Sequence, residues 1–344
     1  MHNRDNDRDV IPAMSIPPVV VAAARTGWNW QWHRLMGGLG PADTEGNYKR
    51  PASDHLEAKR PDTRDLLERP CEQRPRLIIG RSCPWAHRTW LMLRLRGLDR
   101  TVSLLMATAD HRAGRWRLDP PWLNCSSLLE LYQHFEAPPS HRATVPVLVD
   151  PKTNRILGNE SAQLVELLNE WPSDQPESDF NPPDQAQAIE DWQALLQPFV
   201  NDGVYRCGFA RNQAAYDRAE TCLFEALDQL ERSLMEKGPW LCGEQITLAD
   251  LRLFPTLIRW ELVYAPLFGC SRVPLWHFPH LWTWRRRLYG LPGVADTCDG
   301  EAWRRDYYGA LFPLNPGGII PTGPELSTLV NTAAPSQLHG GSGI

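Results

Sequence analysis

Apolar and polar residues begin to follow a regular pattern near residue 75, and that pattern predicts the first elements. Residues 75–80 form a short apolar run closed by glycine, which predicts a buried strand. Residues 84–97 carry apolar and charged side chains at helical spacing, with proline in the first turn and glycine at the end, and predict a helix. A strand over 101–106, an irregular stretch to Trp122 and a helix over 127–135 follow.

The pattern continues with a hairpin and one more helix. Residues 145–150 and 155–158 are apolar runs separated by a Pro-Lys-Thr-Asn turn, and residues 160–171 are predicted to be helical. Strands joined by crossover helices predict a mixed sheet with helices on both faces. The order of elements resembles the α/β thioredoxin fold, which we assign to a domain over residues 73–172.

Helical patterns dominate the second half of the chain. A segment rich in proline and acids, 173–182, predicts a linker before an all-helical domain over 183–314 and a tail over 315–344. Thr247 and Asp250 predict a reciprocal cap at the start of one helix. Helices are expected over residues 184–199, 213–237, 247–260 and 276–289.

The first 72 residues are predicted to form an arm that packs across the folded body. They are rich in proline, glycine and charge, and Trp28, Trp30 and Trp32 at a spacing of two predict an extended segment. The apolar run over 19–24 is far shorter than the roughly 20 residues of a membrane span, and the acidic residues before it argue against a signal peptide. We therefore expect a cytoplasmic protein that does not bind membranes.

The overall charge gives no reason to expect a nucleic-acid partner. The formal net charge is −5, so the chain has no general field that attracts phosphate. The basic cluster over 285–287 is interpreted as the solvated face of a helix.

The candidate chemistry centres on one of eight cysteines. None of them forms a C-x-x-C pair, which in a chain of 344 residues predicts reduced thiols. Cys83 stands where the first strand leads into the first helix, and the unpaired N–H groups and dipole of a helix start stabilise a thiolate. Because Ala86 stands three positions on, a disulfide formed at Cys83 must be resolved by an outside thiol such as glutathione. The other cysteines are interpreted as small buried apolar residues.

Two neighbours on the same helix are candidates for a role beside the thiol. His87 lies four residues after Cys83 and could assist proton transfer, but a solvated or structural histidine is the expectation. Arg88 is expected to be an exposed helical arginine. The sequence holds no H-E-x-x-H motif and no paired cysteines, so no metal site is predicted.

Two further segments predict a glutathione site. Pro146 lacks the N–H that a central strand needs, which favours a cis Val145–Pro146 bond and leaves the backbone of Val145 free to pair with an extended peptide. Glu160 and Ser161 begin a helix whose N–H groups and hydroxyl can hold a carboxylate, and glutathione carries two. A trans proline on an edge strand and a plain helix cap are the alternative interpretations.

Several blocks of sequence match a known family in order. They are Cys-Pro-Trp-Ala-His-Arg-Thr (83–89), Thr-Val-Pro-Val-Leu (144–148), Asn-Glu-Ser (159–161), Asn-Asp-Gly-Val-Tyr-Arg-Cys-Gly-Phe-Ala (201–210), Asp-Leu-Arg-Leu-Phe (250–254), Val-Tyr (263–264), Tyr-Tyr (307–308) and Asn-Pro-Gly-Gly-Ile-Ile-Pro (315–321). Together they resemble the glutathionyl-hydroquinone reductases, the xi-class glutathione transferases.

The resemblance implies an activity and a set of site residues. Cys83 would take glutathione from a glutathionyl-hydroquinone as a mixed disulfide, and a second glutathione would release oxidised glutathione. The family assigns proton delivery to tyrosines, which carries over to Tyr205 and then to Tyr307 or Tyr308. Hydroquinone contacts carry over to Tyr205, Tyr264 and Tyr308, and glutathione contacts to Trp116, Arg142, Val145, Pro146, Glu160 and Ser161.

The same resemblance implies a homodimer, and it leaves the natural quinone open. Trp116 stands in Gly-Arg-Trp-Arg-Leu where the family has Gly-Trp-x-Phe, and the stretches 107–124 and 272–277 diverge.

The alternative functions are an omega-like thiol transferase or dehydroascorbate reductase that uses the same Cys83, a conjugating transferase, and a binding module of the same fold without catalysis.

Overall fold

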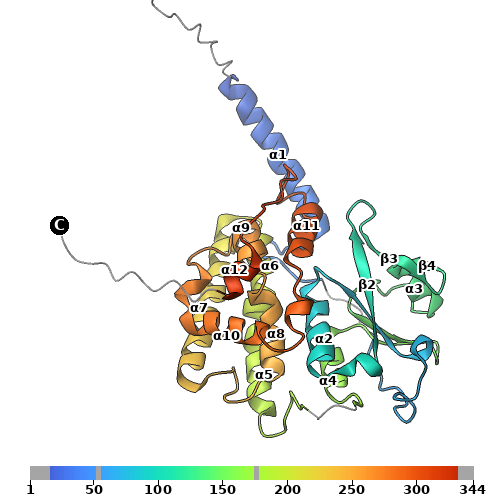
Figure 1. The fold of residues 1–344 in the computed structure, drawn as a ribbon. Coiled ribbons are helices and arrows are strands. Elements are labelled where there is room, and N and C mark those ends of the chain that lie inside the picture. The colour runs from blue at the N-terminus through green and yellow to red at the C-terminus, as the bar shows by residue number, and fades with distance from the viewer. Residues whose placement is uncertain (1–15, 52–55, 174–177, 332–344) are drawn as a thin grey trace, which may run out of the picture.

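The computed structural model describes residues 16–51, 56–173 and 178–331. A half that contains a β-sheet lies beside a helical half, and one long helix, α1, projects from the body (Figure 1). The helix α11 lies near the base of α1, beside the junction of the two halves. The site described below is built where these parts meet.

Six strands form one mixed sheet in the order β4-β3-β2-β1-β5-β6. β1 pairs with β2 in parallel, and every other pairing in the sheet is antiparallel. A parallel pair needs a crossover, and here α2 (Pro84–Leu95) supplies it. The predicted mixed sheet is therefore confirmed. The strands are β1 Arg76–Gly80, β2 Ser103–Asp110, β3 Arg115–Trp122, β4 Cys125–Ser127, β5 Val147–Asp150 and β6 Arg155–Gly158.

Helices cover the sheet on both faces, as the sequence predicted. In Figure 1, α2 and α4 (Ser161–Asn169) lie on the side of the sheet that faces the helical half, and α3 (Leu128–His134) lies beside β3 and β4. Along β1 the residues Leu77, Ile78 and Ile79 are fully buried. A central strand covered on both faces has a continuous apolar sequence for this reason.

The stretch predicted to be irregular holds the second half of β2 and the whole of β3. Only Leu118 is buried along β3, and the strand contains Pro120 and Pro121. A strand near the edge with one buried side chain shows little apolar alternation. The sequence pattern therefore did not reveal it.

The helical half contains the predicted reciprocal cap. Thr247 precedes α8, and its backbone N–H donates to the carboxylate of Asp250 at 2.9 Å. That carboxylate also accepts from the backbone N–H of Leu241 and from the indole N–H of Trp284. The structural role predicted for both residues is confirmed. The helices of this half are α5 Ala186–Leu195, α6 Gly203–Gly208, α7 Gln213–Lys237, α8 Leu248–Leu257, α9 Ala265–Phe268, α10 Pro279–Tyr289, α11 Gly300–Ala310 and α12 Leu326–Asn331.

The basic cluster on α10 is not a solvated face, contrary to the interpretation from sequence. Arg285 is fully buried, and its guanidinium lies 2.6 Å from the carboxylate of Glu261 and donates to the carbonyl of Leu257. At 3.6 residues per turn, position 285 falls on the same inward side as Leu281 and Leu288. Only Arg287 of the three is exposed.

The segment with three tryptophans is a helix and not an extended arm. α1 runs over Pro18–Leu39, with Pro18 in its first turn and a run of valine and alanine behind it. Trp32 donates its indole N–H to the carbonyl of Pro313 at 3.0 Å, whereas Trp30 is mostly exposed. In a helix, residues two positions apart point to different sides. The spacing of the tryptophans therefore did not distinguish an extended segment from a helix. None of the described helices is long and apolar enough to cross a membrane.

Candidate active site

Cys83 is the N-cap residue of α2, between the end of β1 at Gly80 and Pro84 in the first helical turn. Its Sγ lies 3.6 Å from the carbonyl oxygen of Val145. Burial raises the pKa of the Cys83 thiol, and the backbone N–H groups of Ala86 and Trp85 act in the opposite direction. The helix start does stabilise the thiolate as predicted, but burial is the larger effect.

One cavity lies beside this position and has a volume of about 250 Å³. Its lining includes five of the six residues predicted to contact glutathione, namely Arg142, Val145, Pro146, Glu160 and Ser161. The Val145–Pro146 bond is cis, as predicted. Glu160 is the N-cap residue of α4 and accepts from the N–H of Ala162 at 3.1 Å. Backbone, hydroxyl and cationic groups thus converge on one space.

A second cavity of about 250 Å³ holds Cys83 itself. Its wall is largely apolar and includes Trp116, the sixth residue predicted to contact glutathione, together with Ala310 and Leu311. The ring of Trp116 packs directly on Gly80, because a Cβ at that position would lie 2.3 Å from the ring. Glycine at the end of β1 therefore lets the indole approach the thiol.

The two cavities adjoin each other beside Cys83. Trp85 and Tyr205 line both of them. Cys83 lines the second cavity and contacts the carbonyl of Val145, which lines the first. A ligand that occupies both spaces would place the atoms at its centre next to the thiol.

Three tyrosines from three parts of the helical half meet at the second cavity. The hydroxyl of Tyr205 lies 2.6 Å from that of Tyr307, and the hydroxyl of Tyr264 lies 3.1 Å from that of Tyr307. Tyr205 and Tyr307 line the cavity, whereas Tyr264 is fully buried behind them. Burial raises the pKa of all three hydroxyls, so they stay protonated and able to donate at neutral pH.

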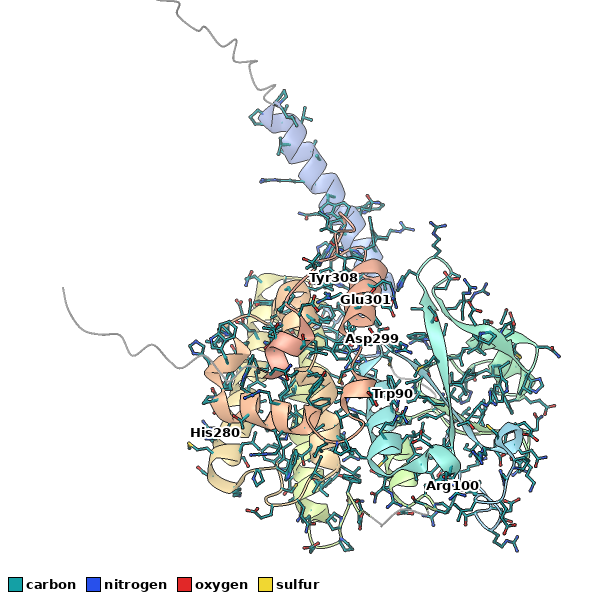
Figure 2. The ribbon with its side chains drawn as sticks, viewed as in Figure 1. Trp90, Arg100, His280, Asp299, Glu301 and Tyr308 are labelled. Carbon is teal, nitrogen blue, oxygen red and sulfur yellow. The ribbon has the colours of Figure 1, made fainter. Side chains whose placement is uncertain are left out.

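Tyr308 stands apart from this group. Figure 2 labels it on α11, and it lines neither cavity. Its hydroxyl is buried, and no group in the described part of the chain makes a hydrogen bond to it. Of the two adjacent tyrosines predicted as candidates, the structure therefore places Tyr307 with Tyr205.

Comparison with known proteins agrees with this geometry. The glutathione S-transferase N-terminal domain family matches residues 82–171, and the C-terminal domain family matches residues 213–287. The glutathionyl-hydroquinone reductase YqjG of Escherichia coli is 34% identical over 263 residues, which cover 74% of this chain and 80% of that protein. The glutathionyl-hydroquinone reductase PcpF of Sphingobium chlorophenolicum is 35% identical over 72% of this chain and 82% of its own length.

Solved structures give the same result. The xi glutathione S-transferase of Phanerochaete chrysosporium superposes with a TM-score of 0.74 at 31% identity, over 82% of this chain and 94% of that one. The glutathione-bound structure of Escherichia coli YqjG superposes with a TM-score of 0.67, over 74% of this chain and 86% of that one. The chain belongs to the xi-class glutathione transferases. The resemblance found in its sequence blocks is confirmed.

In this xi-class transferase, one site residue comes from a segment that sequence reasoning left without a site role. Arg50 lines the first cavity, lies 2.6 Å from the carboxylate of Asp202, and places its guanidinium over the ring of Trp85 at 4.0 Å. Asp202 belongs to the block over 201–210 that carried part of the resemblance. Nothing in the local sequence around residue 50 indicated the contact.

Arg88 is buried, contrary to the expectation of an exposed arginine. Its guanidinium donates to the amide oxygen of Asn201 at 2.7 Å and also lies over the ring of Trp85, at 4.5 Å. Burial lowers the pKa of Arg88 to about 9. The helical half covers this face of α2 and leaves the side chain no path to water. Arg88 therefore joins α2 to the start of the block over 201–210.

His87 is a structural histidine of the transferase. The side chain is buried, and burial together with the nearby Arg259 guanidinium lowers its pKa well below the usual value. The neutral ring accepts at Nδ1 from Arg259 at 2.9 Å and donates at Nε2 to the hydroxyl of Thr297 at 2.8 Å. It lines neither cavity. The structural expectation is confirmed.

The loop just before Cys83 is held from the helical half. The carbonyl of Arg81 accepts from the indole N–H of Trp303 at 3.0 Å and from Arg259 at 3.4 Å. Trp303 lies on α11, the helix that also supplies Tyr307. The position of the thiol relative to the tyrosines is therefore fixed by both halves of the protein.

All eight cysteines lie in the described ranges, and each is a free thiol, as predicted. The interpretation of the other seven as buried apolar residues holds for Cys125, Cys207 and Cys270 but is wrong for Cys71 and Cys222, which are exposed because they lie on the surface of the fold. No group of three or more histidine, cysteine or acidic side chains within those ranges is arranged to hold a metal ion.

Proposed function

We propose that this protein is a glutathionyl-hydroquinone reductase whose nucleophile is Cys83. The observation that supports this proposal is the position of Cys83 at the junction of two cavities, one polar and one largely apolar. A tripeptide bonded through sulfur to an aromatic ring also has a polar part and an apolar part, joined at the sulfur. Its peptide fits the first cavity and its ring fits the second, which places the shared sulfur beside the thiol.

The reaction is a transfer of glutathione from carbon to sulfur. The Cys83 thiolate attacks the substrate sulfur, the new S–S bond forms, and the bond between sulfur and the ring carbon breaks. The electron pair of that bond stays on the ring carbon, which takes up a proton and leaves as hydroquinone. The ring is reduced and the Cys83 sulfur is oxidised. A second glutathione thiolate then attacks the mixed disulfide, which restores Cys83 and gives oxidised glutathione.

The lining of each cavity supports a role in this sequence. The backbone of Val145 is free to pair with the peptide, Ser161 at the start of α4 and the guanidinium of Arg142 are available to its carboxylates, and Trp116 covers it near the sulfur. Tyr205 and Tyr307 are protonated and face the apolar cavity, so they are suited to bind a ring hydroxyl and to supply the proton.

The second candidate is a thiol transferase or dehydroascorbate reductase of the omega type, which would use the same cysteine. The apolar wall around Tyr205 and Tyr307 favours an aromatic ring over the polar ring of dehydroascorbate. A binding module without catalysis would need no accessible thiol between its cavities.

The experiment is an assay of the purified protein with glutathione and a panel of glutathionyl-hydroquinones, with dehydroascorbate as the competing substrate. We expect hydroquinone and oxidised glutathione in a 1:1 ratio, and kcat/KM at least about tenfold higher for the aromatic substrates. Faster turnover of dehydroascorbate would favour the second candidate. No turnover of dehydroascorbate or of the glutathionyl-hydroquinones would favour a binding module without catalysis. The homodimer stays a prediction, which sedimentation of the same sample checks.

A further inference from the structure

The wall of the second cavity contains an aspartate and a histidine that the proposed chemistry does not use. Asp306 and His111 both line it, and His111 Nε2 lies 3.6 Å from Asp306 Oδ1. His111 directly follows β2 in the sheet half, whereas Asp306 lies on α11 next to Tyr307. The pair therefore connects the two halves at the wall of the cavity.

The carboxylate of Asp306 is buried and only partly satisfied. Its side chain is 8% exposed. Oδ1 accepts a hydrogen bond from Nε of Arg305 at 3.1 Å, and Nε2 of His111 lies 3.6 Å from it, beyond hydrogen-bond distance. Among the described residues, no hydrogen bond uses Oδ2. Oδ2 keeps some exposure at the cavity wall, so a ligand hydroxyl can donate a hydrogen bond to it.

The position of His111 depends on a glycine of α11. A Cβ added to Gly309 would lie 3.3 Å from the imidazole, so the ring rests against the helix where no side chain stands. Contact with the helix restricts the ring and keeps it beside Asp306. His111 therefore acts as a positioning residue for the carboxylate.

We propose that Asp306, positioned by His111, is a subsite for the ring hydroxyl remote from the sulfur. This inference rests on the proposed function. The hydroxyl next to the sulfur-bearing carbon is within the reach of Tyr205 and Tyr307, and the remote hydroxyl donates to Asp306. The subsite selects reduced aromatic rings over rings without a donor at that position.

The selection follows from the chemistry of the groups. A phenol O–H donates a hydrogen bond to a carboxylate. A quinone carbonyl or a methyl ether oxygen can only accept, so its lone pairs would face those of the carboxylate. The neighbouring wall residues Ala109, Ala310 and Leu311 supply no alternative side-chain partner. A site built to bind a hydroxyl rejects analogues that lack it more strongly than an apolar pocket rejects a small change in size.

The test compares a glutathionyl-hydroquinone with its analogue methylated at the remote oxygen. For the wild-type protein we expect kcat/KM to favour the free hydroxyl by about 100-fold. In Asp306→Leu the preference should fall below about tenfold, through slower turnover of the hydroquinone. Asp306→Asn keeps the shape of the side chain, and its amide can donate to the ether oxygen, so the methylated substrate should gain. His111→Leu should give an intermediate preference.

The control is Glu301→Gln, which removes one negative charge from the exposed side of the same helix, where Figure 2 labels it. It should keep the wild-type preference. If the wild-type protein turns over both substrates equally, or if Asp306→Asn and His111→Leu keep the full preference, the inference is wrong and the proposed function still stands. If the wild-type protein turns over neither substrate, the proposed function itself fails.

Discussion

The hydroxyl oxygens of Tyr205 and Tyr307 lie 2.6 Å apart, although 102 residues of sequence separate them. Their hydrogen bond joins α6 to α11 at the wall of the cavity that holds Cys83. Since burial raises the pKa of both hydroxyls, both stay protonated at neutral pH, and the proposed reaction requires one of them to supply the proton.

The first prediction concerns this pair. Tyr205→Phe should leave glutathione binding nearly unchanged and slow the release of hydroquinone by about 100-fold, because a lost proton donor affects the transition state more than the bound peptide. Single-turnover kinetics and calorimetric binding of glutathione measure the two effects separately. Tyr308→Phe on the adjacent position is the matched control and should behave as the wild type. Unchanged kinetics of Tyr205→Phe at saturating substrate would show that Tyr205 contributes only to packing.

The pH dependence of Cys83 gives a second prediction. Burial raises the pKa of its thiol, so at a given pH the thiolate fraction is smaller than for an ordinary cysteine, whose pKa is about 8.5. The rate of alkylation should therefore keep rising as the pH increases through that value. Iodoacetamide labelling, with the exposed Cys71 and Cys222 replaced by serine and N-acetylcysteine as the reference thiol, measures the midpoint. A midpoint below that of the reference would contradict the dominance of burial.

The contact between Gly80 and Trp116 gives a third prediction. A methyl group at Gly80 would lie 2.3 Å from the indole and must displace it, so Gly80→Ala should raise the KM for the glutathionyl substrate by about tenfold. Trp116→Ala should have a similar effect, and the double variant should be little worse than either, because both changes remove the same contact. Gly290→Ala, where the nearest atom is at 3.4 Å, is the control. Additive losses would show that Gly80 does not act through Trp116.

Much of the sheet half could be predicted, because its signals are local. Cys83 before Pro84 indicated a helix start, and the cis bond before Pro146 followed from one missing N–H in a strand. The Thr247 and Asp250 cap was readable for the same reason, since both partners lie within one helical turn. In each case the interacting groups are close in sequence, and their chemistry is independent of the rest of the fold.

Contacts between segments distant in sequence could not be predicted from the local pattern of residues. Arg88 has the spacing of a surface arginine, and its burial depends on distant partners such as Asn201, 113 residues away. Arg50 likewise reaches the site through Asp202. Tyr205 and Tyr307 lie on α6 and α11, neither of which the apolar periodicity predicted, and they became candidates only through the family resemblance. The 22-residue helix α1 was misread because its tryptophans lie on different sides.

A fourth prediction separates Cys83 from the other thiols. Cys83→Ser should lose nearly all turnover of glutathionyl-hydroquinones, because only this thiol lies at the junction of the two cavities. Cys207→Ser and Cys242→Ser should keep most of it, since neither cysteine lines either cavity. Steady-state assays of the three variants measure this. Comparable losses in all three would remove the basis for choosing Cys83.

The most direct test of the account is the covalent state of the protein after reaction with substrate alone. When a glutathionyl-hydroquinone is supplied without free glutathione, intact-mass analysis should show one glutathionyl adduct per chain, mapped by peptide analysis to Cys83. Free glutathione should then remove it, because no second cysteine stands in the Cys-Pro-Trp-Ala motif to resolve the mixed disulfide. A disulfide between Cys83 and another cysteine of the chain, or an adduct that forms equally in Cys83→Ser, would contradict the monothiol mechanism.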